Sequence, residues 1–267
     1  MSKQSISLGI AISLSGRYAL LGRQVLEGLE CYVRDVNASG GMRLQDRQLS
    51  VSLIVEDDES DESKIRGLVE KLIRQDQIDL LIGPYGSGLT LAAAEMADAF
   101  QYVLWNHSGS SDEIFECNLS SVVGLLTPAS LYLCAILDLI KALDPTARKV
   151  ALFSAKTGFA ADMAAGALAW IRREGFTLTV HQSYRSGLED FRPLLGPIKE
   201  DPPDVFLSVG RVEDDILLGR QLRELKPRLK AVDPDLRDRH GLRRRRTRPR
   251  RDERFKAAAQ ASCGLGH

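Results

Sequence analysis

The sequence predicts an α/β protein built from two doubly wound parallel-sheet lobes. Short apolar runs alternate with longer segments of helical periodicity over most of the chain, which is the pattern of βαβ units. The alternation pauses near Val122–Thr127 and then resumes, which indicates a second βαβ series. We therefore expect one lobe over residues 1–123 and a second, incomplete lobe over residues 124–232.

The elements of the first lobe follow from local patterns. Residues 48–55 alternate and then become apolar, as a strand that enters a core does, and Asn37–Gly41 ends the preceding helix with glycines. The loop after the first strand is expected over Ser13–Gly22. The expected strands are Ile6–Ile12, Gln48–Val55, Asp79–Ile82, Tyr102–Leu104 and one that begins near Ser121, and the expected helices are Gln24–Asn37, Ser63–Gln75 and one that begins at Leu89.

The second series repeats this alternation, and Pro128 marks the start of its first helix. Its expected helices are Ala129–Leu143, Phe159–Arg173, Glu189–Glu200 and Glu213–Lys226, and its expected strands are Lys149–Phe153, Thr177–Val180 and Asp204–Val209.

The last part of the chain differs in charge from the rest. The formal net charge is zero, but residues 1–230 contain 25 Lys+Arg and 31 Asp+Glu, whereas residues 231–267 contain 11 and 5. The arginine-rich segment 233–267 is either a basic arm for nucleic acid or anionic lipid, or the product of a frameshift near Val232. We favour the frameshift, and so expect a truncated second lobe, a disordered tail and no nucleic-acid partner.

The stretch Asp79–Thr90 has the features of a binding loop. A short buried strand breaks at Gly83-Pro84, and a run of good helix formers begins after Gly88. Ser87 is placed to act as the N-cap, and the free amides of the first helical turn suit an anion such as a carboxylate. The alternative is a plain strand-to-helix connection capped by a serine.

A second loop of this kind follows the next strand. Trp105, Asn106 and His107 lead into a cluster of hydroxyl groups that ends at Asp112. Loops at neighbouring strand ends converge on one cleft, so we expect these two to share a ligand. The alternatives are that Trp105 simply packs, that His107 is structural, and that Ser110–Asp112 only cap a helix at Glu113.

Several other classes of site are not supported. The acidic run Glu56–Glu62 could suggest a metal site, but a solvated loop and a helix N-terminus explain it. No P-loop, dinucleotide fingerprint, metal-binding cysteine spacing or catalytic triad is evident, so we expect no enzyme activity, no metal and no cofactor. Cys31 and Cys134 are expected to be buried on apolar helix faces.

The motifs together resemble those of the type I periplasmic solute-binding proteins, specifically the branched-chain amino-acid (Leu/Ile/Val) binding group of ABC importers. The resemblance covers roughly residues 5–230. The motifs that carry it are Ser13–Gly16 with Gly22, Asn37–Gly41, Glu56–Asp58, Ile82–Ser87 and Gly158-Phe159.

This resemblance implies a two-lobed clamp that closes on a small solute. Matched by position, it assigns ligand binding to Leu21, Tyr85, Gly86, Ser87, His107, Ser108, Gly109, Phe159 and Arg211. The chain departs from the family at Trp105–His107, where relatives often have Thr-Pro-Ala, and at Arg211, where they often have an aromatic residue. The ligand is therefore an amino acid or a related small carboxylate or amide.

The function that the resemblance implies is that of the solute-binding component of an ABC importer. The alternative is a ligand-sensing receptor domain of the same fold without a transport role. The expected partners are the small-molecule ligand and the membrane permease, and the expected state is a monomer. The family location is the periplasm, although Met1–Ser5 leads directly into a strand, so the chain as written has no signal peptide and reads as cytoplasmic.

Overall fold

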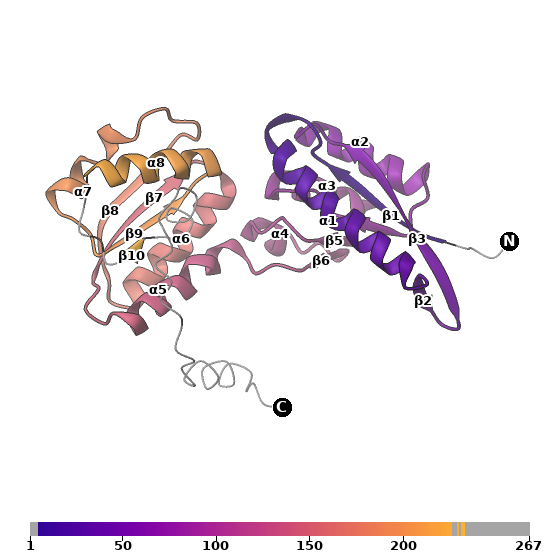
Figure 1. Ribbon diagram of the computed structural model, residues 1–267, viewed down its shortest axis with the longest axis horizontal. Helices are drawn as coiled ribbons and strands as arrows, with labels where there is room; N and C mark the ends of the chain where they lie inside the picture. Colours follow the sequence, from indigo (N-terminus) through magenta and orange to yellow (C-terminus); the bar gives the residue numbers. More distant parts are fainter. Residues whose placement is uncertain (1–4, 226–228, 230, 233–267) are drawn as a thin grey trace.

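The computed structural model describes residues 5–225, residue 229 and residues 231–232. The arginine-rich segment 233–267, for which the sequence predicts disorder, lies outside these residues. Figure 1 shows two lobes joined by the stretch of chain between β6 and α5. Within the described residues, no helix is long and apolar enough to cross a membrane.

The first lobe is built on a six-stranded sheet with the order β2-β3-β1-β4-β5-β6. All its neighbours pair in parallel except β2, a short antiparallel strand that the sequence patterns do not predict. The strands are β1 (Ser5–Ile12), β2 (Met42–Leu44), β3 (Arg47–Asp57), β4 (Leu80–Ile82), β5 (Leu104–Asn106) and β6 (Val122–Gly124).

Helices cover both faces of this sheet. Its helices are η1 (Gly16–Tyr18), α1 (Ala19–Ala38), α2 (Glu62–Arg74), α3 (Ser87–Ala99) and α4 (Asp112–Glu116). One apolar cluster joins the sheet to α1, and a second joins it to α2 and α3. Burial on both faces explains why β1 is apolar along most of its length.

The second lobe is built on a parallel four-stranded sheet with the order β10-β9-β7-β8. One large apolar core holds it together and includes Phe153, Phe191 and Phe206, all fully buried. The strands are β7 (Lys149–Ala155), β8 (Thr177–Tyr184), β9 (Val205–Val209) and β10 (Ala231–Val232). The helices are η2 (Ala129–Leu131), α5 (Tyr132–Leu143), α6 (Gly158–Arg173), η3 (Arg192–Leu194), α7 (Gly196–Glu200) and α8 (Val212–Leu225).

The structure corrects the predicted helix Glu189–Glu200. Only η3 and the short α7 form there. Pro193 and Pro197 each lack a backbone N–H and fit only the first turn of a helix, so the segment breaks into two short pieces. Cys134 is buried as expected, but Cys31 is exposed on α1, so the prediction for Cys31 is wrong.

The predicted loop Ser13–Gly22 is also too long, because α1 already begins at Ala19. Leu21 and Gly22 therefore lie in the first turns of this helix. A Cβ at Gly22 would lie 2.0 Å from the carbonyl oxygen of Ser13. The glycine lets α1 pack directly against the carboxyl end of β1, which sequence periodicity alone does not reveal.

Candidate functional site

The loops that follow β4 and β5 lie side by side and are joined by Ser87. Its Oγ accepts hydrogen bonds from the backbone N–H groups of Ser110 (3.2 Å) and Ser111 (3.1 Å). The prediction that Ser87 is the N-cap of α3 is wrong. Gly86 is the N-cap, with a φ of 94°, and Ser87 is the first helical residue. The side chain thereby reaches across to the next loop instead of capping its own helix.

This arrangement limits what the Ser87 hydroxyl can do. Two backbone N–H groups occupy its two lone pairs, so its own O–H can act only as a donor. Among the described residues, no group accepts that proton. The first-turn amides of α3 lie at the same point, and no side chain caps them. The start of α3 therefore offers hydrogen-bond donors to an acceptor group.

Asn106 organises the loop after β5, and the sequence analysis missed its importance. Its side chain donates to the Gly109 carbonyl at 2.7 Å and accepts from the Gly109 N–H at 2.8 Å. The signal was the order Asn-His-Ser-Gly, because asparagine commonly bonds to the backbone that follows it in turns. Gly109 is required here, since a Cβ would lie 2.5 Å from the Thr90 side chain.

His107 is half-buried and tied to its surroundings through both ring nitrogens. Nε2 lies 2.9 Å from the Gly83 carbonyl oxygen, so it must donate, and Nδ1 then accepts from the Ser108 hydroxyl. Burial lowers the pKa of His107, although the hydrogen bond to Gly83 opposes the shift. Because the Ser108 hydroxyl donates its hydrogen bond to His107 Nδ1, the lone pairs of its oxygen can accept from a donor group. The two serines thus offer opposite hydrogen-bonding character.

The loop after β1 also reaches this region. Tyr18 of η1 contacts Tyr85 edge to face, with ring centroids 5.7 Å apart. Burial raises the pKa of Tyr85, and the neighbouring Tyr18 adds to the shift. Leu21 lies one turn further along α1 and is partly exposed. The loops after β1, β4 and β5 are therefore neighbours, which a single ligand bound by the candidate residues of all three loops requires.

The acidic run after β3 ties two loops together. The Asp57 carboxylate accepts from the backbone of Leu14 at 2.9 Å and from the Ser15 hydroxyl at 2.8 Å, and Asp58 accepts from the Ser13 hydroxyl. Burial raises the pKa of Asp58, against hydrogen bonds from Ser13 and from the Ser60 N–H that lower it. The described residues contain no cluster of three or more side chains suited to a metal.

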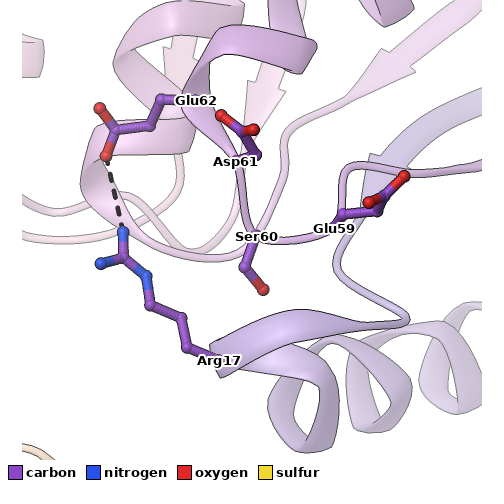
Figure 2. A pocket seen from close by; sticks show the side chains of 5 residues that line it. All are labelled: Arg17, Glu59, Ser60, Asp61 and Glu62. Carbon is purple, nitrogen blue, oxygen red and sulfur yellow. Dashed lines mark ion pairs between the residues drawn. The ribbon is translucent and has the colours of Figure 1, made fainter.

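Beside these loops lies an open hollow of about 550 Å³. Figure 2 shows Arg17 pointing from η1 toward Glu62, with 3.8 Å between their charged groups. A Cβ at Gly88 would lie 2.2 Å from the Glu62 carboxylate, so this carboxylate rests against the first turn of α3. The hollow adjoins the candidate site, but charged residues on its rim, such as Arg17 and Glu62, already form ion pairs with each other.

The second-lobe candidates lie at the carboxyl ends of β7 and β9. Phe159 is the second residue of α6 and contacts Tyr132 edge to face, with centroids 6.1 Å apart. Arg211 lies between β9 and α8. In the described part of the chain, no hydrogen bond or ion pair joins either residue to the first-lobe loops.

A different second-lobe residue makes that connection. The Asp162 carboxylate, on α6, accepts from the Ser111 hydroxyl and from the Asp112 N–H (3.0 Å) at the start of α4. Asp112 in turn accepts from the Ser130 N–H at 3.0 Å, just after the crossing between lobes. These bonds bring the carboxyl edges of the two sheets together at the loop that follows β5.

The arrangement matches a known family. The profile described as "Periplasmic binding protein" matches residues 5–232. The chain belongs to this family of periplasmic binding proteins. Leu/Ile/Val-binding protein homolog 7 of Brucella abortus is 24% identical over 226 residues, which are 82% of this chain and 55% of that protein. This periplasmic binding protein therefore spans about half the length of the curated relatives that it matches.

Solved structures support the same fold. LivJ of Streptococcus pneumoniae, a branched-chain amino-acid transporter substrate-binding protein in complex with isoleucine, superposes with a TM-score of 0.70 at 20% identity, over 83% of this chain and 61% of that one. A solute-binding protein of an ABC transporter from Rhodopseudomonas palustris BisB5, in complex with 3,4-dihydroxybenzoic acid, gives a TM-score of 0.73 at 18% identity, over 88% and 63%. A further protein from R. palustris, in complex with benzoate, gives 0.71 at 20% identity, over 87% and 63%. The prediction of a type I periplasmic binding protein fold is confirmed.

Proposed function

We propose that this chain is the solute-binding component of an ABC importer and holds a small carboxylate, such as an amino acid or an aromatic acid, between its two lobes. The proposed ligand-binding residues of the second lobe are Phe159 and Arg211. Those of the first lobe are Leu21, Tyr85, Gly86, Ser87, His107, Ser108 and Gly109. We also propose that the two lobes end near residues 123 and 232. The protein would act as a monomer in the periplasm, with a membrane permease as its partner.

One observation carries the proposal. The Ser87 hydroxyl has both lone pairs occupied by backbone N–H groups and no acceptor for its proton among the described residues. A carboxylate at this position would accept that proton together with the first-turn amides of α3, and the helix dipole would favour its charge. The ligands named for the two R. palustris proteins are aromatic acids, and isoleucine also carries a carboxylate.

Ser108 extends the argument to a second group on the ligand. Because its proton is directed to His107, its oxygen can accept from an ammonium, an amide or a hydroxyl group. An α-amino acid carries an acceptor, its carboxylate, and a donor, its ammonium group, which match the opposite character of the two serines. This pairing supports amino acids and their amides beside simple acids.

The proposal is tested by isothermal titration calorimetry with isoleucine and with benzoate. Ser87→Ala is expected to weaken binding by about 1–3 kcal/mol, because the carboxylate loses a donor in a desolvated site. Ser52→Ala is the matched control, since Ser52 is exposed on β3 and far along the strand from its carboxyl end. Unchanged affinity in Ser87→Ala, or the absence of binding of any small carboxylate by the native chain, would contradict the proposal.

A further inference from the structure

Three basic residues follow three neighbouring strands of the second sheet, β9, β7 and β8. Lys156 comes directly after β7, Arg185 directly after β8, and Arg211 two residues after β9. In the β7–β8 register, Ala155 is paired with Tyr184, and the Lys156 N–H donates to the Tyr184 carbonyl at 2.8 Å. Lys156 and Arg185 therefore stand next to each other at the carboxyl edge.

Arg211 completes the row. Ser154 of β7 is paired with Val209 of β9, so continuing that register by two residues places Arg211 level with Lys156. Adjacent strands lie about 4.8 Å apart, so three cationic residues line one edge within about 10 Å. The helix α6 also begins at this edge, and its N-terminal dipole end adds positive potential, whereas the first turn of α8 is acidic.

None of these three side chains has a counter-ion within the described part of the chain. They form no ion pair or side-chain hydrogen bond there, whereas Lys141 and Lys149 of the same lobe pair with acidic residues. Like charges placed side by side without a counter-ion repel one another. An anion bound beside the row would be attracted by these charges.

Two acidic residues in the first turn of α8 accept hydrogen bonds from neutral groups of the same edge. Asp214, which is only 3% exposed, accepts from the Ser186 hydroxyl at 2.6 Å and from the Gly187 N–H at 2.8 Å. Asp215 accepts from the Ser208 hydroxyl at 2.7 Å. These hydrogen bonds hold the loops in place, and among the described residues neither carboxylate forms an ion pair with the basic row.

Of the three basic residues, Lys156 borders a hollow of about 550 Å³ between α6 and β8, which Thr157, His181 and Ser183 also line. The row adjoins the first lobe as well, because α6 begins just after Lys156 and its Asp162 binds the loop after β5. The Asp162 hydrogen bonds thus link the lobe that carries the row to the loop after β5.

We propose that the ligand carries two anionic groups, a carboxylate that binds at Ser87 and a second acidic group that binds the row of Lys156, Arg185 and Arg211. This inference rests on the proposed function and names its substrate class. A guanidinium group binds a carboxylate or a phosphonate through paired hydrogen bonds, so either could be the second group. The ligand is then a small diacid instead of an aliphatic amino acid.

The experiment compares ligands that differ only in the second acidic group. Calorimetry on the 267-residue chain uses glutarate, pentanoate and 4-phosphonobutyrate, with isoleucine and benzoate alongside. The native chain is expected to bind a diacid at least about tenfold more tightly than pentanoate, which is about 1.4 kcal/mol. The stronger of the two diacids identifies the second group as a carboxylate or a phosphonate.

Charge-removing variants locate that preference. Arg211→Gln and Lys156→Gln are each expected to reduce the diacid-to-pentanoate ratio severalfold. The control variants Arg172→Gln and Lys199→Gln should keep the native ratio, because these basic residues also form no ion pair with any described residue but lie on α6 and α7, away from the row. Thermal unfolding of every variant verifies that it is folded.

Three results would overturn the inference. Equal affinity for diacids and for pentanoate, isoleucine or benzoate would remove it while leaving the proposed function standing. A diacid preference that survives in Arg211→Gln and Lys156→Gln would remove the basic row from the site. If no acid binds, both the inference and the proposed function fail.

Discussion

At the carboxyl edge of the first sheet the loops bind one another, whereas at the same edge of the second sheet three basic side chains have no partner among the described residues. Asp57 and Asp58 hold the loop after β1, and Ser87 and Asn106 hold the loop after β5. The second lobe uses Asp214 to hold one loop, and within the part of the chain that the structure describes Lys156, Arg185 and Arg211 form no ion pair. The first lobe is thus a preorganised set of donors, and the second supplies charge.

The comparison teaches how two similar sheets can divide a binding task. A prearranged hydroxyl loses little entropy when it binds, which favours geometric selection of one group. Long basic side chains act over a wider range and select by charge. If the lobes differ in this way, mutations in each lobe, loss of the bond between them and a change of pH should each have a distinct effect on stability.

The largest expected effect concerns the glycines that let a helix approach backbone in each lobe. A Cβ would lie 2.0 Å from the Ser13 carbonyl at Gly22 and 1.8 Å from the Ser130 carbonyl at Gly166. Gly22→Ala and Gly166→Ala are each expected to lower the free energy of unfolding by about 2–3 kcal/mol, because backbone must move. Urea unfolding measures the loss, and hydrogen exchange shows which lobe it affects.

Gly28→Ala is the matched control for this pair. Gly28 lies on α1, and a Cβ there meets nothing within 4 Å. Alanine should raise the free energy of unfolding by about 1 kcal/mol through helix propensity alone. If Gly22→Ala also stabilises the protein, the close packing of α1 on β1 is wrong.

An intermediate effect is expected at the bond between the lobes. Asp162→Ala removes the acceptor of the Ser111 hydroxyl and of the Asp112 N–H. We expect a loss of about 1–2 kcal/mol in unfolding free energy, because two partly buried donors lose their partner. Faster amide exchange should appear at residues 111 and 112, on the opposite lobe. Exchange changes confined to α6 would show that the lobes are not coupled here.

The smallest effect is a pH dependence that belongs to the first lobe. Burial lowers the pKa of His107 from its ordinary value of 6.5, so between the two pKa values the unfolded chain binds more protons than the folded one. The stabilising contribution of neutral His107 is therefore present above that range and lost as the pH falls through it. Thermal unfolding between about pH 7.5 and pH 5.5 measures this loss.

His107→Gln gives the comparison for the pH experiment. Glutamine can still donate to the Gly83 carbonyl but does not titrate in this range. The variant should lose less stability than the native chain on acidification. An equal loss in both proteins would show that other groups are responsible.

Much of the fold could be predicted from local patterns. Apolar runs and helical periodicity identified the parallel strands and most helices of both lobes, and the turns after β4 and β5 marked the candidate site. These features are determined locally, since each residue's face follows from its spacing along the chain. The error in the helix predicted at residues 189–200 also has a local cause, because Pro193 and Pro197 each fit only in the first turn of a helix.

The tertiary structure decided which side chains meet. Ser87 binds the loop after β5 because β4 and β5 are neighbours in the sheet, and no spacing within either segment specifies that contact. Asp162 reaches the other lobe, and Lys156 stands beside Arg185, only because strand order and register bring distant segments together. The sequence by itself determined the elements and their order, whereas the contacts between them depend on a register that is set when the whole sheet forms.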